Sequence, residues 1–319
     1  MSNETNTEIK ATEAIESGNS TKEGEKVFNL DDFSQIIDLI KNNNEEVIKN
    51  KLIAHIKNVI ALQTDKYKFV FLYRTIGFID DSDADNIYNA LLNQDKKDIF
   101  LVLNSTGGRI EPAYLISKCC KESKGKKFIV TIPRYAKSAA TLIALGADEI
   151  HMGPLSQIGP IDPQMNGLPA LGLSSALECI AKLCEKYPTS SDMFAQYLAK
   201  TLSLNMLGYF ERIPESAKDY AIRLLQNKNP VLTEKKISEI AGKLVYEYKD
   251  HSFVIDKDES RELLGDGIIK IETKEYVLGN NIYKLMETVN LVYRVLKNRM
   301  FNLIGSVEDL QGMDIPIKT

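Results

Sequence analysis

The chain has 319 residues, of which 44% are hydrophobic and 26% are charged, and its formal net charge is −4. This composition is ordinary for a globular protein with one large domain or two small ones. The mild negative charge excludes a global attraction to nucleic acid or to an anionic membrane, and no window approaches the roughly 18–20 apolar residues of a membrane span. We therefore expect a cytoplasmic protein with no nucleic-acid partner and no membrane span.

Cofactor and metal motifs are missing from the sequence. The four cysteines show no CxxC spacing and no histidine close by that would indicate zinc; they are Cys119, Cys120, Cys179 and Cys184. A P-loop and an HExxH segment are also lacking. We expect reduced thiols, as is usual in the cytosol, and no metal or cofactor.

The N-terminal region divides into two parts. Residues 1–27 are polar, have few large hydrophobes and lack the apolar core of a signal peptide, so they are predicted to be a disordered tail. Residues 28–64 carry apolar side chains at helical spacing on both sides of an NNNEE interruption. This pattern predicts a helical hairpin that packs on the main domain or on a second subunit.

Strand-like and helix-like segments then alternate. The predicted strands are 66–74, 98–104, 126–134 and 148–154, and the predicted helices between them are 80–94, 109–123 and 136–147. Such alternation is typical of βαβ units around a parallel sheet. The fold class is therefore α/β.

The remainder of the chain is mostly helical. Helical patterns run from Pro163 to about residue 245, the segments 252–255 and 267–272 return to a sheet edge, and residues 281–300 form an amphipathic helix. We divide this part into a main domain, residues 65–277, and a C-terminal helix and tail, residues 278–319.

Two loops carry the candidate chemistry. The first contains the adjacent glycines Gly107 and Gly108, and the second contains Ser138 among small alanines at the start of a helix. Because both loops follow neighbouring parallel strands, they should meet in one crevice. Backbone N–H groups of Gly107 or Gly108 and of Ala139 could then hold an oxyanion beside the serine hydroxyl.

Two segments carry a family resemblance. LVLNSTGGRIEPAYLI (101–116) resembles the strand–NSPGG–helix segment of ClpP-type peptidases, and AKSAATLIALGADEIHMGPLSQIGPIDPQ (136–164) resembles their nucleophile helix and following strand. The chain is most similar to the serine dehydrogenase proteinases, relatives of ClpP and of signal peptide peptidase A. The resemblance implies a ClpP/crotonase-like spiral of ββα units with added N- and C-terminal helices. It also implies that Ser138 is the nucleophile and that Gly107, Gly108 and Ala139 form the oxyanion hole.

The general base is the open question, because a serine hydroxyl needs one within hydrogen-bond reach. At the spacing where ClpP has its histidine, this sequence has Asp162, so the ClpP-type triad is not evident. Relatives of signal peptide peptidase A use a Ser–Lys dyad, for which we choose Lys200, in an apolar and hydroxyl-rich segment, over Lys182 and Lys186. His251 is the alternative base, or fixes a local turn.

Three functions are consistent with these residues. The first is an ATP-independent serine endopeptidase that cleaves polypeptides through an acyl-enzyme. The second is a non-catalytic scaffold or chaperone-like ring, and the third is a crotonase-like acyl-CoA enzyme, for which Glu111 is the one suitable carboxylate beside the glycines. The resemblance also implies a homo-oligomer assembled through helices outside the core.

Overall fold

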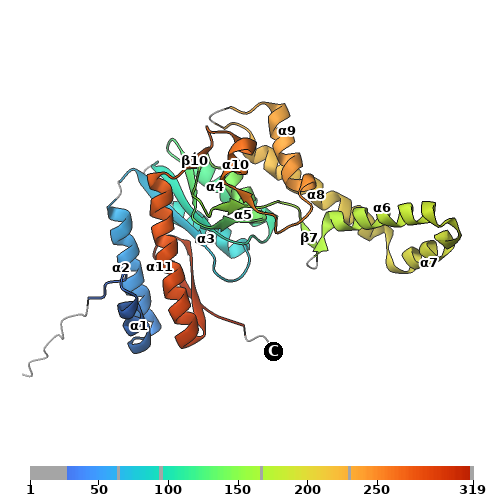
Figure 1. The fold of residues 1–319 in the computed structure, drawn as a ribbon. Helices are drawn as coiled ribbons and strands as arrows, with labels where there is room; N and C mark the ends of the chain where they lie inside the picture. Colours follow the sequence, from blue (N-terminus) through green and yellow to red (C-terminus); the bar gives the residue numbers. More distant parts are fainter. Residues whose placement is uncertain (1–26, 63–64, 93–95, 166–167, 229–230, 317–319) are drawn as a thin grey trace, which may run out of the picture.

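A seven-stranded sheet forms the centre of the protein (Figure 1), which we describe from a computed structural model at residues 27–62, 65–92, 96–165, 168–228 and 231–316. In spatial order the strands are β10 (Ile269–Ile271), β5 (Glu149–Met152), β3 (Phe128–Ile132), β2 (Asp98–Asn104), β1 (Tyr67–Tyr73), β11 (Arg299–Gly305) and β12 (Leu310–Asp314). The first five strands are parallel, the sixth pairs antiparallel with the fifth, and the seventh pairs antiparallel with the sixth. The predicted α/β class is therefore confirmed.

Helices cover both faces of this sheet (Figure 1). One face holds α1 (Phe33–Asn42), α2 (Glu45–Ala61) and α11 (Lys274–Lys297). The other holds α3 (Asp81–Leu91), α4 (Ile110–Ser123), α5 (Ala139–Leu145), the end of α8 (Leu204–Leu225), α9 (Glu234–Gly242) and α10 (Lys257–Leu264).

Alternating side chains of the strands fill two separate cores. In β1, Phe71 and Tyr73 belong to the core under α1, α2 and α11, whereas Val70 and Leu72 belong to the core on the opposite face. Each strand is apolar throughout because both of its faces are buried, as is typical of parallel sheets with helices on both sides.

The C-terminal region differs from the prediction of a helix followed by a tail. The helix α11 ends at Asn298, whose left-handed conformation (φ 53°) stops it. The chain then enters β11 directly, and the side chains of Phe301 and Leu303 are buried in the sheet. No turn sequence separates the helix from this strand. The sequence pattern alone therefore predicts a helix and a tail, without the strand.

A small second sheet lies beside the central one. It contains β4 (Tyr135–Ala136), β6 (Gln157–Ile158) and β9 (Ile255–Asp256), in the order β4–β6–β9. A two-stranded hairpin, β7 (Gln164–Met165) and β8 (Leu168–Pro169), follows β6. The small sheet matters because its strands lead directly into the candidate site.

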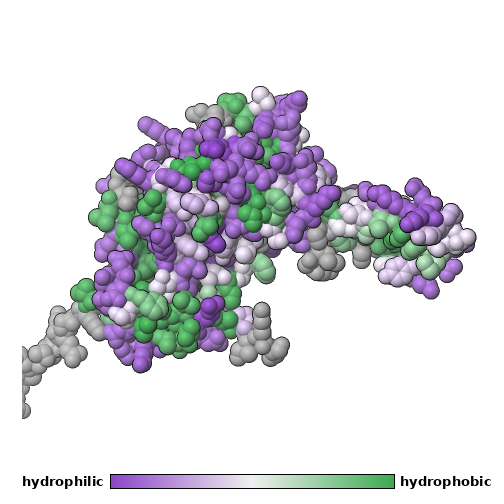
Figure 2. Space-filling model, in the orientation of Figure 1, coloured by the Kyte–Doolittle hydropathy of each residue, from purple (hydrophilic) through white to green (hydrophobic). Residues whose placement is uncertain are grey.

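Residues 170–203 form a helical arm that projects from the rest of the molecule (Figure 1). It consists of α6 (Ala170–Lys186), a 3₁₀ turn η1 (Pro188–Ser190) and α7 (Ser191–Thr201), and α8 leads back to the body. From residue 171 to residue 203 no described side chain is buried. Figure 2 shows the arm as a separate lobe on which apolar and polar side chains are mixed.

Three further observations complete the fold. The tail predicted at residues 1–27 lies, up to residue 26, outside the described residues. Within the described ranges, no helix is both long and apolar enough to cross a membrane. A π-helical turn, η2 (Lys243–Glu247), follows α9.

Candidate active site

The double-glycine bend and Ser138 lie side by side. Ser105 and Ala136 form an isolated parallel bridge between the two loops, so Gly107 and Ser138, two residues further along each chain, continue the same register. A Cβ added to Gly107 would lie 2.8 Å from the Cβ of Ser138 and 2.7 Å from the carbonyl oxygen of Lys137. The proximity expected from the parallel strands is therefore confirmed.

The two glycines are required for different reasons. Gly107 adopts φ +107°, a conformation that side chains disfavour, and it makes the close approach to Ser138. Gly108 passes against Ile79, where an added Cβ would lie 2.2 Å from the backbone nitrogen. The bend is thus held against two neighbours at once.

Ser138 has the backbone conformation of a constrained residue. It precedes α5 with φ 53° and ψ −122°, and its side chain makes no capping hydrogen bond. Positive φ at a non-glycine residue is costly and recurs at functional sites. The side chain lines a cavity of about 840 Å³ instead, so its hydroxyl is accessible rather than used as a helix cap.

Two backbone N–H groups beside Ser138 have no hydrogen-bond partner in the described part of the chain: those of Gly108 and Ala139. The N–H of Gly107, in contrast, donates to the Oγ of Ser105 at 3.1 Å. Gly108 lines the cavity, and Ala139 begins α5, where helix N–H groups are unsatisfied. The pair has the chemistry of an oxyanion hole.

A histidine in the wall of the same cavity is paired with a buried carboxylate. His251 Nδ1 lies 2.7 Å from Asp162 Oδ1, and His251 itself contributes to the cavity wall. Asp162 is 3% exposed, and its other oxygen accepts a hydrogen bond from Gln164 Nε2 at 3.0 Å. Because a carboxylate only accepts, Nδ1 is the donor, and in the neutral imidazole this leaves the lone pair on Nε2.

The small sheet explains how this pair forms. Strands β6 and β9 are antiparallel, with Ile158 opposite Ile255. Asp162 lies four residues after Ile158 and His251 four residues before Ile255, so the two continue this register at the same end of the sheet. Strand β4, parallel to β6, delivers Ser138 to that end as well.

The His251 loop is anchored on both sides. Lys137, next to the serine, does not line the cavity; its Nζ donates to the carbonyl oxygen of Ser252 at 3.0 Å. The Asp250 carboxylate accepts from the Ser252 hydroxyl and backbone N–H, and these hydrogen bonds lower the pKa of Asp250. The imidazole therefore sits in a fixed loop.

Comparison with known proteins identifies the family of the chain. Residues 35–300 match the family described as "ClpP-like SDH-type serine proteinase". The chain belongs to this ClpP-like serine proteinase family. The expected ClpP-like fold and the resemblance to serine dehydrogenase proteinases are confirmed.

Individual relatives of this proteinase-family chain are distant. Two uncharacterized proteins of Methanocaldococcus jannaschii, MJ0137 and MJ1495, are each 28% identical, over 202 and 211 residues. These matches cover 63% and 66% of this chain and span 64% and 63% of the relatives' own length.

Two solved structures of a membrane-bound stomatin-specific protease, 1510-N, resemble the chain at 17% identity, with TM-scores of 0.40 and 0.39. The similarity covers 75% and 79% of this chain and 86% and 89% of theirs; one is of a variant with a bound substrate peptide.

The lysines considered as candidate bases lie away from the cavity that contains Ser138. Lys200 is exposed on α7 of the arm, and Lys182 and Lys186 are exposed on α6. None of the three lines the cavity that contains Ser138. The structure of the single chain thus brings His251, and not Lys200, to the serine's cavity.

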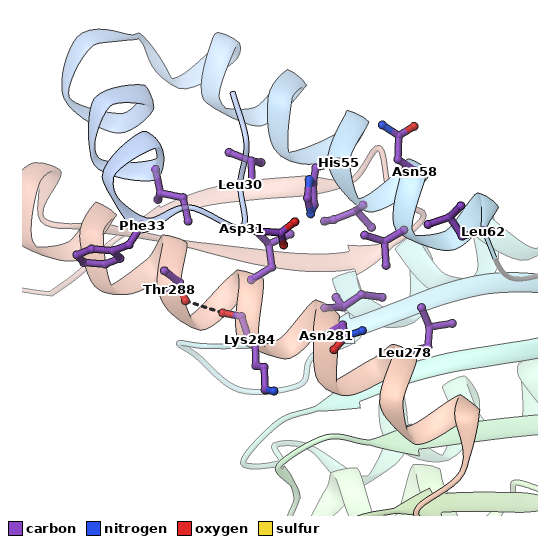
Figure 3. A pocket seen from close by; sticks show the side chains of 15 residues that line it. Leu30, Asp31, Phe33, His55, Asn58, Leu62, Leu278, Asn281, Lys284 and Thr288 are labelled. Carbon is purple, nitrogen blue, oxygen red and sulfur yellow. Dashed lines mark hydrogen bonds between the residues drawn. The ribbon is translucent and has the colours of Figure 1, made fainter. Parts of the chain in front are cut away.

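The other two histidines are also separate from the serine. His151 is buried in β5, where Nδ1 lies 2.7 Å from the Thr273 hydroxyl and burial lowers its pKa. His55 points from α2 into a second cavity, of about 850 Å³, between α1, α2 and α11 (Figure 3). The one hydroxyl lining that second cavity among the described residues is that of Thr288, which donates to the Lys284 carbonyl oxygen.

The sequence indicates Asp162 as the residue at the spacing where ClpP has its histidine. The pair could have been identified by considering Asp162, at this spacing, together with His251. The two residues are 89 positions apart in the sequence, so no local pattern links them. In the described part of the chain, no group of three His, Cys, Asp or Glu side chains is placed to hold a metal ion.

Proposed function

We propose that the protein is a serine peptidase that hydrolyses polypeptides through an acyl-enzyme, with Ser138 as nucleophile, His251 as general base and Asp162 as its orienting partner. The observation that carries the proposal is the His251–Asp162 hydrogen bond in the wall of the cavity that Ser138 also lines. A nucleophile, a base and a group that fixes the base are the parts that acyl transfer requires.

Each group has one task in the reaction. The Ser138 Oγ attacks the scissile carbonyl carbon while its proton passes to His251 Nε2, and the Gly108 and Ala139 N–H groups stabilise the oxyanion. The imidazolium then protonates the leaving amine as the C–N bond breaks. Water then attacks the ester and gives a proton to His251. His251 passes this proton to the Ser138 Oγ as the ester C–O bond breaks, which releases a carboxylic acid and restores the serine hydroxyl.

Asp162 acts through His251. Buried and bonded to Nδ1, it holds the imidazole in the tautomer whose Nε2 accepts a proton, and it stabilises the imidazolium that forms. Gln164 holds the other carboxylate oxygen and so fixes the plane of the carboxylate. The Ser–Lys dyad with Lys200 is the competing assignment, and it would require the arm to reach a serine from which it is separate in the single chain.

The reaction needs no nucleotide, metal or other cofactor, and we propose that it takes place in the cytoplasm. We further propose that the protein forms homo-oligomers. Exposed apolar side chains on α1 and α11, among them Phe33, Leu291 and Val295, support this, because contiguous apolar surface favours association. Light scattering coupled to gel filtration measures the assembly.

The decisive experiment uses a fluorophosphonate probe, which reacts with an activated serine. We expect the wild-type protein to be labelled at Ser138 and to hydrolyse a denatured casein-type substrate. Ser138→Ala should lose both properties, whereas Ser175→Ala, at an exposed serine of the arm, should retain both.

The same experiment separates the alternative functions. Glu111, which a crotonase-like enzyme would use, also lines the cavity and has Arg109 at 3.8 Å; an enzyme of that type would not be labelled at Ser138. A wild-type protein with neither labelling nor turnover would indicate the scaffold and contradict the proposal.

A further inference from the structure

The charged side chains around the candidate cavity are not all paired. Three of them line it: Arg109, Glu111 and Arg212. Arg109 forms an ion pair with Asp81 and has Glu111 at 3.8 Å, so its charge is compensated within the protein. Glu111 shares this guanidinium with Asp81 and so also has a cationic partner.

Arg212 is different. It lies on α8, and its guanidinium makes no ion pair or side-chain hydrogen bond to any described residue; its backbone carbonyl accepts from the Ser216 hydroxyl. The side chain is exposed to solvent at the cavity wall. The cavity therefore presents one cation whose partner is missing from the described chain.

The surroundings of Arg212 favour an anionic partner. Part of the cavity wall is apolar and consists of Phe78, Ile110 and Ile213. A charge beside apolar groups attracts an opposite charge more strongly than it would in bulk water. A guanidinium presents a planar fork of donors that matches a carboxylate with two parallel hydrogen bonds.

We infer that Arg212 determines substrate specificity: it selects polypeptides that place a carboxylate close to the bond attacked by Ser138. The inference rests on the proposed peptidase function. The carboxylate comes from an aspartate or glutamate side chain or from the carboxyl terminus of the peptide, and these two sources share the same chemistry.

The test uses quenched fluorescent peptides that differ at a single position beside the scissile bond. We expect kcat/KM to be roughly 10-fold higher for glutamate than for glutamine there, the effect of one charge-assisted hydrogen bond. Arg212→Gln should reduce the ratio to about 1, and Arg212→Glu should invert the preference toward lysine. In 0.5 M salt the wild-type ratio should shrink, because exposed charges are screened.

A matched control and a second peptide series sharpen the test. Arg223→Gln removes an exposed arginine of the same helix that does not line the cavity, and it should keep the wild-type ratio. A glutamine peptide with a free carboxyl terminus, compared with its amide, measures the terminal source; a glutamate peptide with an amidated terminus measures the side-chain source.

The outcomes separate the inference from the function on which it rests. Hydrolysis of all peptides with no charge preference in the wild type would overturn the role of Arg212 and leave the peptidase assignment intact. If no peptide is hydrolysed, the peptidase assignment fails. Fluorescence anisotropy then measures how tightly the Ser138→Ala variant binds the glutamate and glutamine peptides. Equal binding of the two would contradict the role of Arg212.

Discussion

The body and the arm of this protein are built by opposite rules. In the body, strands such as β2 are buried along their whole length, and the register of paired strands places Ser138, Asp162 and His251 at one end of the small sheet. In the arm, no described side chain between residues 171 and 203 is buried. Buried packing therefore fixes the positions of side chains in the body. In the described residues of the arm, no comparable packing holds the side chains in place.

This difference bears on the chemistry because each region supplies one candidate base. His251 belongs to the body and is held by a buried carboxylate, whereas Lys200 belongs to the arm and is exposed. A catalytic base must be held within a fraction of an ångström of its working position. The body is therefore the better place for the catalytic base. Substitutions of His251 and Lys200 can test this directly.

The largest expected effect is on catalysis. His251→Ala should reduce kcat by about 10³-fold or more, and Asp162→Asn by a similar factor, because the wrong tautomer of His251 would be favoured. Lys200→Ala should change kcat less than about 2-fold. Casein-type turnover and the rate of fluorophosphonate labelling measure both effects.

His55→Ala, in the separate cavity between α2 and α11, serves as the control and should retain wild-type rates. A loss in Lys200→Ala as large as that in His251→Ala would contradict the assignment. Such a result would mean that Lys200 of the arm supplies the base, for example to the Ser138 of a second copy of the chain.

The second prediction concerns stability and uses the same chemical change in both regions. Leu101→Ala in β2, at 0% exposure, should lower the free energy of unfolding by about 2–5 kcal/mol, because it removes buried contacts and leaves a cavity. Leu183→Ala in α6, at 36% exposure, should change it by less than about 0.5 kcal/mol. Urea titrations at two protein concentrations measure both values.

An equal cost for the two variants would erase the distinction between body and arm. If the cost of Leu183→Ala rose with protein concentration, the arm would be packed against another copy of the chain, since association stabilises by mass action.

The sequence predicts the body well because its signals are local. Continuous apolar runs such as residues 98–104 identify buried parallel strands, and loops that follow neighbouring strands must meet, which brings Gly107 to Ser138. The Ser138 loop and the glycine bend could therefore be proposed as one site from the sequence.

The sequence does not reveal the His251–Asp162 pair, because the pair depends on contacts between short segments that are distant in the chain. Strands β6 and β9 pair over two residues each, too short for any pattern, yet their register joins Asp162 to His251. The exposure of the arm cannot be seen in the sequence for a related reason: apolar residues in α7 have the helical spacing of a buried helix, although the helix is exposed.

The smallest expected effect concerns a buried cation of the body. Lys228 is 2% exposed, and its Nζ donates to the carbonyl oxygen of Ala147. Burial, assisted by the nearby charge of Lys121 and opposed by Asp148, lowers the pKa of Lys228 to about 7. In the unfolded chain the amine titrates near 10.5, so between these values the unfolded state binds more protons and stability must rise with pH.

Below pH 7 both states are protonated, and the full cost of burying the ammonium is present; above pH 7 the folded amine is neutral and the cost declines. Lys228→Met should therefore stabilise the protein most at pH 6, and its advantage over the wild type should shrink by about 2 kcal/mol between pH 7 and pH 9. Lys182→Met, at an exposed lysine of α6, should show no such pH dependence in urea titrations over the same range. If the two substitutions respond to pH alike, Lys228 is solvated as fully as a lysine of the arm, and the contrast between a buried body and an open arm does not extend to its charges.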